Sequence, residues 1–174
     1  MSKKPYQEKY HAPGRCSETH GALLPVSTLW HNRSIPADLE MSLNGTVGEL
    51  ERLAGGVAEF CRGNGLDDSV EFDVNLVLEE LFMNTIRHGG CRDQTGAARV
   101  RMRAAQDSVQ LEYTDRGIPF NPLEAPEANV QVPLEERQPG GLGIHLIRQI
   151  MSDLRYQRSD GENQLTMARR MEAK

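Results

Sequence analysis

The spacing of the apolar residues changes along this chain, and that change constrains the fold more than any other feature. Residues 46–63 and 68–88 carry apolar side chains three or four positions apart, which is the pattern of amphipathic helices. The first helix opens with Thr46-Val47-Gly48-Glu49, which has the form of a capping box. Arg99–Arg103 and Val109–Tyr113 then alternate apolar and polar residues, which predicts a hairpin of two strands with one charged face.

The remaining segments predict a two-layer α/β sandwich. Ala37–Leu43 alternates weakly and predicts a first strand, and helical spacing returns from Gly141 onward. A second hairpin joins Leu154–Arg158 to Gln164–Arg170 through the turn Asp160-Gly161. Because strands pair mainly with their sequence neighbours, we expect a largely antiparallel, mixed sheet. Because each helix has one apolar face, we expect all three helices to cover one side of it.

The chain divides into a polar tail and one domain. Residues 1–35 are interrupted by prolines and predict a flexible N-terminal tail with one short strand near Ala22–Val26. Residues 36–174 are enough for a single domain with its own core. Within that domain, the stretch from Gly117 to Gly140 carries five prolines and no clear periodicity, so we expect a lid or binding loop there.

Charge and composition exclude several classes of protein. The net charge of -5 disfavours direct binding of nucleic acid, because a duplex-binding surface needs a dense basic face. We expect the arginines of Arg99–Arg103 to pair with Glu112 across the hairpin instead. No apolar run is long enough to cross a membrane, and the N-terminus lacks the apolar segment of a secretory signal. The three cysteines are far apart, which predicts free thiols and a cytoplasmic protein.

The first candidate motif lies on the second predicted helix. Glu80, Asn84, Arg87 and His88 fall at i, i+4, i+7 and i+8, so they form a polar stripe beside the apolar one. An Asn carbonyl is an oxygen ligand suited to Mg²⁺. A carboxylate one turn away can accept a proton from an attacking hydroxyl. A solvated helix face is the alternative interpretation of this stripe.

The second candidate motif follows an otherwise apolar strand. Asp115 ends that strand, and its carboxylate can accept a hydrogen bond from an amino group such as that of adenine. Gly117 would let the backbone approach the base closely. A strand-end aspartate that starts a turn is the simpler alternative.

The third candidate motif, Gly140-Gly141-Leu142-Gly143, opens the third predicted helix. Exposed amides at a helix N-terminus, with glycines that allow close approach, make an anion site. The alternative is a flexible helix start. The motif is not a P-loop, because no G-K-[ST] follows, and no parallel βαβ unit surrounds it as a dinucleotide fingerprint would require.

Taken together and in order, the three motifs resemble those of the GHKL ATPase superfamily. E-x-x-x-N ending in H-G on a helix is followed by D-x-G after a strand, then a lid, then G-G-L-G into a helix. Within this superfamily, residues 37–171 resemble the stand-alone RsbW/SpoIIAB-type anti-sigma factor serine kinases. The resemblance implies the Bergerat ATP-binding fold.

The resemblance also implies a role for each matching residue. Glu80 would be the catalytic general base, and Asn84 the Mg²⁺ ligand. Asp115 would read adenine, with Gly117 beside it. The remaining positions implied to contact ATP are His88, Arg137 in the lid, Gly141, Leu142 and Gly143. The chain departs from the common D-x-G-x-G form at Pro119, which leaves the hinge of the lid undefined.

The function implied is an ATP- and Mg²⁺-dependent protein-serine/threonine kinase. It would phosphorylate a STAS-type anti-anti-sigma protein, sequester a sigma factor and form a homodimer. A non-catalytic ATP-binding switch module is the alternative, which the retention of Glu80 in register with Asn84 disfavours. The catalytic half of a sensor histidine kinase fits less well, because no membrane span or dimerisation helix pair is evident. A gyrase- or MutL-like ATPase would need a transducer domain.

Overall fold

The computed structural model of the chain describes residues 38–125 and 141–171. Short turns or longer loops separate its helices and strands. In chain order these are β1 Leu39–Leu43, α1 Glu49–Gly63, α2 Asp68–Arg87, β2 Ala98–Ala104, β3 Ser108–Asp115, α3 Gly141–Ile150, β4 Ser152–Ser159 and β5 Glu162–Arg170. The expected strand at Ala22–Val26, Arg137 and most of the expected lid lie outside the described residues.

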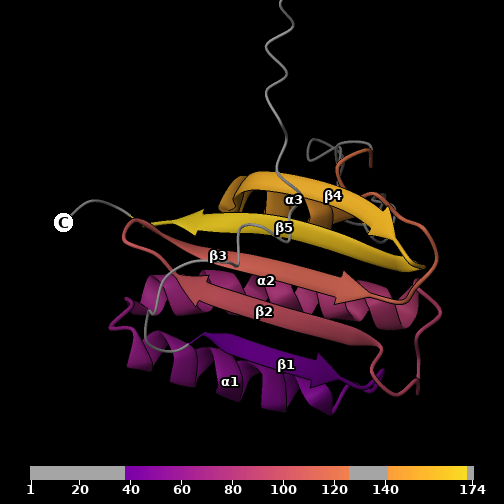
Figure 1. Cartoon of the computed structure of the whole chain (residues 1–174), viewed down its shortest axis with the longest axis horizontal. Helices are drawn as coiled ribbons and strands as arrows, with labels where there is room; N and C mark the ends of the chain where they lie inside the picture. The colour runs from indigo at the N-terminus through magenta and orange to yellow at the C-terminus, as the bar shows by residue number, and fades with distance from the viewer. Residues whose placement is uncertain (1–37, 126–140, 172–174) are drawn as a thin grey trace, which may run out of the picture. The chain divides into compact units, whose positions relative to one another are not determined.

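The sheet has five strands in the order β1-β2-β3-β5-β4. The predicted two-layer sandwich is confirmed, and all four pairings between described strands are antiparallel. Figure 1 shows the sheet facing the viewer with the three helices behind it. The described helices therefore cover one face of the sheet, and we call the other the open face.

Strand β5 lies in the interior of the sheet, between β3 and β4, although it is the last strand in the sequence. Burial explains this order. In β4 no residue is fully buried, as suits an edge strand, whereas Leu165 to Ala168 of β5 are buried in succession. The chain therefore leaves β3, forms α3, runs along the edge as β4 and returns as β5.

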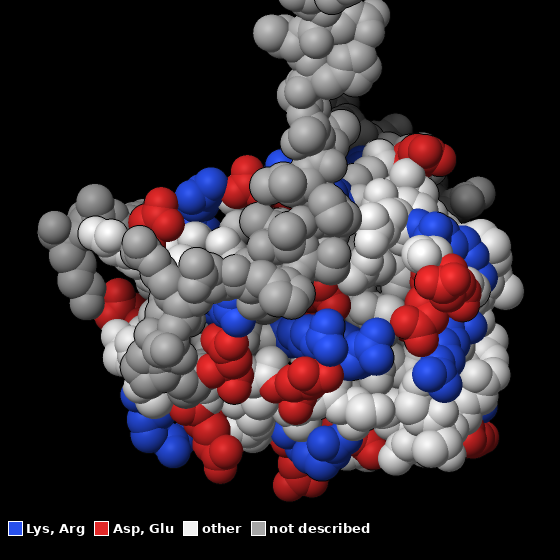
Figure 2. Space-filling view, in the orientation of Figure 1, with Lys and Arg blue, Asp and Glu red and all other residues white. Residues whose placement is uncertain are grey.

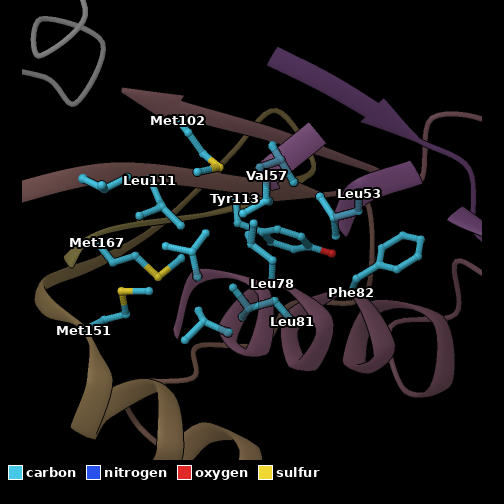
Figure 3. Packing of buried hydrophobic residues seen from close by; sticks show 14 of the residues in the cluster. Leu53, Val57, Leu78, Leu81, Phe82, Met102, Leu111, Tyr113, Met151 and Met167 are labelled. Atoms are coloured by element: carbon cyan, nitrogen blue, oxygen red, sulfur yellow. The ribbon is translucent and has the colours of Figure 1, made fainter. Parts of the chain in front are cut away.

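The core forms where the apolar stripe of α2 meets the helix-facing side of β2 and β3. Val70, Val74, Val77, Leu78, Leu81 and Phe82 are all buried, which confirms the stripe expected from the sequence. Side chains on β2 and β3 alternate, so Met102, Leu111 and Tyr113 point toward the helices. Figure 3 shows these side chains packed against Leu78 and Leu81 of α2. The core thus fixes α2 beneath the centre of the sheet.

The expected capping box at Thr46–Glu49 does not form. The residue that caps α1 is Gly48, and no side chain bonds the first amides of the helix. The carboxylate of Glu49 instead accepts hydrogen bonds from Asn44 Nδ2 at 3.0 Å and from Arg52 Nε at 2.7 Å. Competing donors on the neighbouring loop and on the next helical turn therefore replace the predicted contact.

The open face of the sheet is polar and its charges are mostly paired. Arg101 contacts Glu112 at 3.4 Å across the hairpin, as expected, and also Glu40 at 3.0 Å. Arg103 pairs with Asp38, the residue directly before β1. Figure 2 shows acidic and basic side chains alternating over this face. Within the described ranges, no helix has the length and apolar character needed to span a membrane.

Candidate functional site

Asp115 ends β3 with its side chain on the helix-covered side, where it is largely buried. Its Oδ1 accepts hydrogen bonds from the backbone N–H of Gly117 at 2.8 Å and from Asn163 Nδ2 at 2.9 Å. Among residues 38–125 and 141–171, no donor reaches Oδ2. Burial raises the pKa of the Asp115 carboxyl above its ordinary value, and the two hydrogen bonds oppose that rise. One oxygen is therefore held by the protein while the other can accept a further donor.

Asn163 is a site residue that the sequence analysis missed. Its Nδ2 also donates to the carbonyl of Ile118 at 2.9 Å, and its Oδ1 accepts from Tyr156 Oη at 2.9 Å and Arg158 Nη1 at 2.6 Å. Only 7 % of Asn163 is exposed. A signal was present, because Asn163 precedes Leu165 and Met167 at period two and so occupies an inward position of β5. A polar residue at an inward position requires partners, and one of the partners of Asn163 is the carboxylate of Asp115.

Gly117 and Gly89 bring the first two motifs into contact. A Cβ added to Gly117 would lie 2.7 Å from Asp115 Oδ1 and 3.0 Å from the Cα and carbonyl oxygen of Gly89. The next amide, that of Ile118, donates to the Gly89 carbonyl at 3.1 Å. Gly89 follows α2, and its own amide donates to the carbonyl of Asn84 at 3.0 Å. The two backbones approach so closely that a side chain at position 117 would displace the Asp115 carboxylate or the backbone of Gly89.

Gly143 and Glu80 bring the first and third motifs into contact. A Cβ added to Gly143, in the first turn of α3, would lie 2.3 Å from Glu80 Oε2 and 2.9 Å from its Cδ. The Glu80 carboxylate therefore rests directly on the backbone of α3 where that helix begins. Glu80 and Asn84 are half-buried while Arg87 and His88 are exposed, so the first half of the polar stripe of α2 is turned toward the site and the second half is solvated.

The other predicted site residues lie near the contacts that Gly117 makes with Gly89 and Gly143 makes with Glu80. Asn84 is half-buried and lies one turn after Glu80, and His88 is exposed and caps α2 at its C-terminal end. Gly141 and Leu142 begin α3. Arg137 lies outside the described residues. The described parts of the three motifs thus meet along the C-terminal half of α2.

A buried hydroxyl pair holds α2 against β3 beside the site. Thr85 Oγ1 lies 2.8 Å from Tyr113 Oη, and it also donates to the Leu81 carbonyl at 3.1 Å. Burial raises the pKa of Tyr113 well above its ordinary value, so the phenol stays neutral and keeps this contact. Thr85 follows Asn84 directly, and Tyr113 lies two residues before Asp115. The contact between the two hydroxyl groups therefore fixes the distance between the side chains of Asn84 and Asp115.

No group of three His, Cys, Asp or Glu side chains that could hold a metal ion occurs among the residues that the structure describes. The half-buried oxygen-bearing side chains on the C-terminal half of α2 are Glu80 and Asn84. Carboxylate and amide oxygens are ligands that Mg²⁺ accepts, and Mg²⁺ usually completes its octahedral shell with water and with phosphates of the substrate. The donor set therefore fits a magnesium ion that arrives with a nucleotide.

The family model of the histidine kinase-like ATPase domain matches residues 43–169 of this chain. The match spans every described element from the end of β1 to β5 and includes all three motifs. The chain therefore belongs to the histidine kinase-like ATPase domain family.

Two curated relatives place the chain more closely within that family. It is 32% identical over 98 residues to the serine/threonine-protein kinase BtrW of Bordetella bronchiseptica, covering 56% of this chain and 69% of BtrW. It is 26% identical over 102 residues to the serine-protein kinase RsbW of Bacillus licheniformis, covering 54% of this chain and 61% of that protein. The resemblance to RsbW-type kinases inferred from the motifs is confirmed.

Solved structures share the fold. The RsbU and RsbW domains of Rv1364c from Mycobacterium tuberculosis align with a TM-score of 0.57 at 19% identity, over 79% of this chain and 33% of that one. The SiaB–SiaC complex from Pseudomonas aeruginosa aligns with a TM-score of 0.51 at 18% identity, over 75% of this chain and 88% of that one. At these identities the likeness concerns the fold alone.

Proposed function

We propose that this protein is an ATP- and Mg²⁺-dependent serine/threonine-protein kinase of RsbW type. The observation that carries the proposal is the position of Glu80, whose carboxylate lies against Gly143 at the start of α3 and one helical turn from Asn84. A base, a metal ligand and a helix N-terminus then converge where the terminal phosphate would lie.

At one end of the site, Asp115 would read the base. Oδ1 is occupied by Gly117 and Asn163, so Oδ2 is the oxygen available to the exocyclic amine of adenine. This assignment requires an ionised or at least accepting carboxyl group, and the two donors on Oδ1 favour the ionised form against the effect of burial. Gly117 adds no side chain beside the base, which permits close stacking on the backbone.

At the other end, Asn84 would contribute its side-chain oxygen to Mg²⁺. The amides of Gly141, Leu142 and Gly143 would donate to phosphate oxygens, since the first amides of a helix lack partners within it. We assign weaker roles to His88 at the end of α2 and to Arg137. When bound, Mg²⁺ neutralises charge on the triphosphate and orients its terminal group.

Glu80 would act as the general base of phosphoryl transfer. Its carboxylate takes the proton of the attacking serine or threonine hydroxyl as the oxygen–phosphorus bond forms. The bond between the γ-phosphorus and the β–γ bridging oxygen breaks, and ADP leaves with the electron pair. Contact with Gly143 holds the carboxylate beside the start of α3, so the base is positioned before the substrate arrives.

For partners, we propose a STAS-type anti-anti-sigma protein as the phosphorylated substrate and a sigma factor as the sequestered protein, in a cytoplasmic homodimer. The relatives are named as serine or serine/threonine kinases, which supports a protein substrate; the particular partners rest on the resemblance of the motifs. The second candidate function is an ATP-binding switch module that captures partners without phosphorylating them. The half-buried position of Glu80 against Gly143 favours the kinase, since a passive binder needs no carboxylate there.

The test compares Glu80→Gln with Glu79→Gln in the full-length chain. Both replacements are isosteric, but Glu79 is exposed, so it serves as the matched control. With labelled ATP and a STAS protein, we expect phosphoserine formation by Glu80→Gln to fall by roughly 10²-fold or more, with ATP affinity nearly unchanged, because general-base loss has that scale. Glu79→Gln should match the wild type. If the wild type binds ATP and the STAS protein yet forms no phosphoserine, the switch module is correct. An unimpaired Glu80→Gln would remove the base assignment.

A further inference from the structure

We propose that a second binding site, specific for a carboxylate group, lies on the open face of the sheet behind Asp115. The site is a pocket of about 240 Å³ between the ends of β1, β2 and β3. It lies on the opposite face of β3 from the nucleotide site, because Thr114 faces outward and the next residue, Asp115, faces the helices. The proposal does not depend on kinase activity. Its lining includes Ser42, Gly96, Arg99, Thr114, Arg116 and Glu162.

The main observation is a pair of buried polar atoms that have no partner. Among the described residues, only Arg99 Nε and Thr114 Oγ1 are buried side-chain nitrogen or oxygen atoms without a hydrogen bond. Both belong to residues that line this pocket. The two residues are direct neighbours, because Arg99 of β2 pairs with Thr114 of β3. Thr114 is only 4 % exposed. A buried donor left unpaired costs free energy, so two neighbouring ones indicate a group that both would bind.

The charges at the Thr114 end of the pocket favour an anion. There, Glu162 accepts from Arg99 at 3.3 Å and from Arg116 at 3.0 Å, so two guanidinium groups share one carboxylate. The other acidic lining residue, Glu40, pairs with Arg101. The four charged lining residues are neutral in sum, so a singly charged carboxylate suits this end better than a phosphate dianion, which would bring excess negative charge against Glu40 and Glu162.

The shape of the pocket leaves further donors for the same group. Arg116 uses Nε for Glu162, and its Nη1 reaches to 4.0 Å from the position that a Cβ on Gly96 would take. Ser42 Oγ lies 3.7 Å from that same position. Because Gly96 has no side chain, space remains between Ser42 and Arg116 on this side of the pocket. The Arg116 guanidinium borders that space. The Arg116 guanidinium is exposed and can donate to a carboxylate. Arg99 Nε and Thr114 Oγ1 would donate to the same group once their side chains turn toward the pocket. Figure 2 shows the open face on which the pocket lies.

The experiment is an NMR titration of the ¹⁵N-labelled full-length protein with sodium acetate, against sodium chloride at equal ionic strength and pH. We expect saturable shifts at the amides of Gly96, Ala98 and Thr114, with a dissociation constant on the order of millimolar, as suits a ligand of four heavy atoms. Shifts that do not saturate, or that chloride reproduces, would overturn the proposal.

Variants locate the binding. Thr114→Val is isosteric but cannot hydrogen-bond, and Arg99→Lys keeps the charge but removes Nε. Each should weaken acetate binding by about tenfold or more, because hydrogen bonds to a charged group are strong. Thr166→Val is the matched control, since Thr166 is also buried on the open face but does not line the pocket. Retained binding in both pocket variants, or equal loss in the control, would show that this pocket is not the site.

A further comparison identifies the source of the carboxylate. A glutamate blocked at its amino and α-carboxyl groups carries two amides that can donate to Glu40 and Glu162 at the rim. Tenfold tighter binding than acetate would identify an acidic side chain of a partner protein as the natural occupant. Equal or weaker binding would identify a free small carboxylate. Either result retains the site.

Discussion

Replacing Gly143 with alanine should separate catalysis from stability in this protein. The added Cβ would lie 2.3 Å from Glu80 Oε2, a distance that real Cβ atoms do not tolerate. Its nearest neighbours are all atoms of the Glu80 side chain, which is flexible, and not backbone. The carboxylate therefore moves by about 1 Å while α3 stays in place.

The expected magnitudes follow from this geometry. Overpacking a flexible side chain costs at most about 1–3 kcal/mol, and alanine regains up to about 1 kcal/mol over glycine within a helix. With the full gain from alanine, we expect the free energy of unfolding to fall by roughly 0–2 kcal/mol. Misplacing a catalytic group by about 1 Å costs on the order of 10²-fold in rate, so phosphorylation of a STAS substrate should fall by about that factor.

The assays are urea unfolding of the free protein and single-turnover phosphorylation with labelled ATP. Gly55→Ala in α1 is the matched control, because nothing lies within 4 Å of its added Cβ. That variant should phosphorylate at the wild-type rate and be more stable by about 0.5–1 kcal/mol. A Gly143→Ala enzyme that phosphorylates normally would refute the reasoning, since the base would then not depend on its contact with α3.

Four further predictions concern the other end of the site and the thiols. Gly117→Ala should cost more stability than Gly143→Ala, by about 1–3 kcal/mol in urea unfolding, because its Cβ meets the backbone of Gly89, which cannot rotate away. Asp115→Asn should weaken ATP binding by about 1–3 kcal/mol in calorimetry, since an amide nitrogen or a reoriented oxygen replaces the acceptor. The same variant should be more stable than wild type without ATP at pH 7, because a raised carboxyl pKa means that ionised Asp115 destabilises the fold. That advantage should disappear as the pH falls through the raised pKa toward the ordinary 3.8, and an advantage independent of pH would contradict it. Burial raises the pKa of Cys61 to about 11 and also raises that of Cys91, so peptide mapping after iodoacetamide treatment at pH 8 should find both thiols unmodified until the protein is unfolded. Rapid labelling of either thiol in the folded protein would show that its site opens.

Most of the fold could be predicted because the apolar residues report directly on it. The stripe of α2 and the alternation of β2 and β3 follow from which side chains must be buried, and both were confirmed. The order of the strands could not be predicted in the same way. Pairing of β3 with β5 depends on which strand of the second hairpin is the more apolar, and the exposed residues of β4 were the only signal.

The candidate site was predicted in part, for the same physical reason. Glu80, Asp115 and the glycines stand in local patterns, and patterns indicate chemistry when residues near in sequence act together. Asn163 acts on Asp115 from 48 positions away, through a pairing that exists only once β5 lies beside β3. The unpartnered atoms of Arg99 and Thr114 were likewise hidden, because absence of a partner is a property of the folded sheet.

The interior position of β5 also sets when this domain can become active during synthesis. Until residues 162–170 leave the ribosome, β3 has an unpaired edge, and Asp115 lacks its contact with Asn163. An exposed strand edge is a template for pairing with other chains, so the nascent protein is most prone to aggregate in that interval. On the proposed assignment of Asp115 to adenine, ATP cannot assist folding earlier, because the contact of Asp115 with Asn163 forms last. A nucleotide that stabilises the finished domain therefore acts after the final strand is inserted, and a chaperone that shields β3 would act before it.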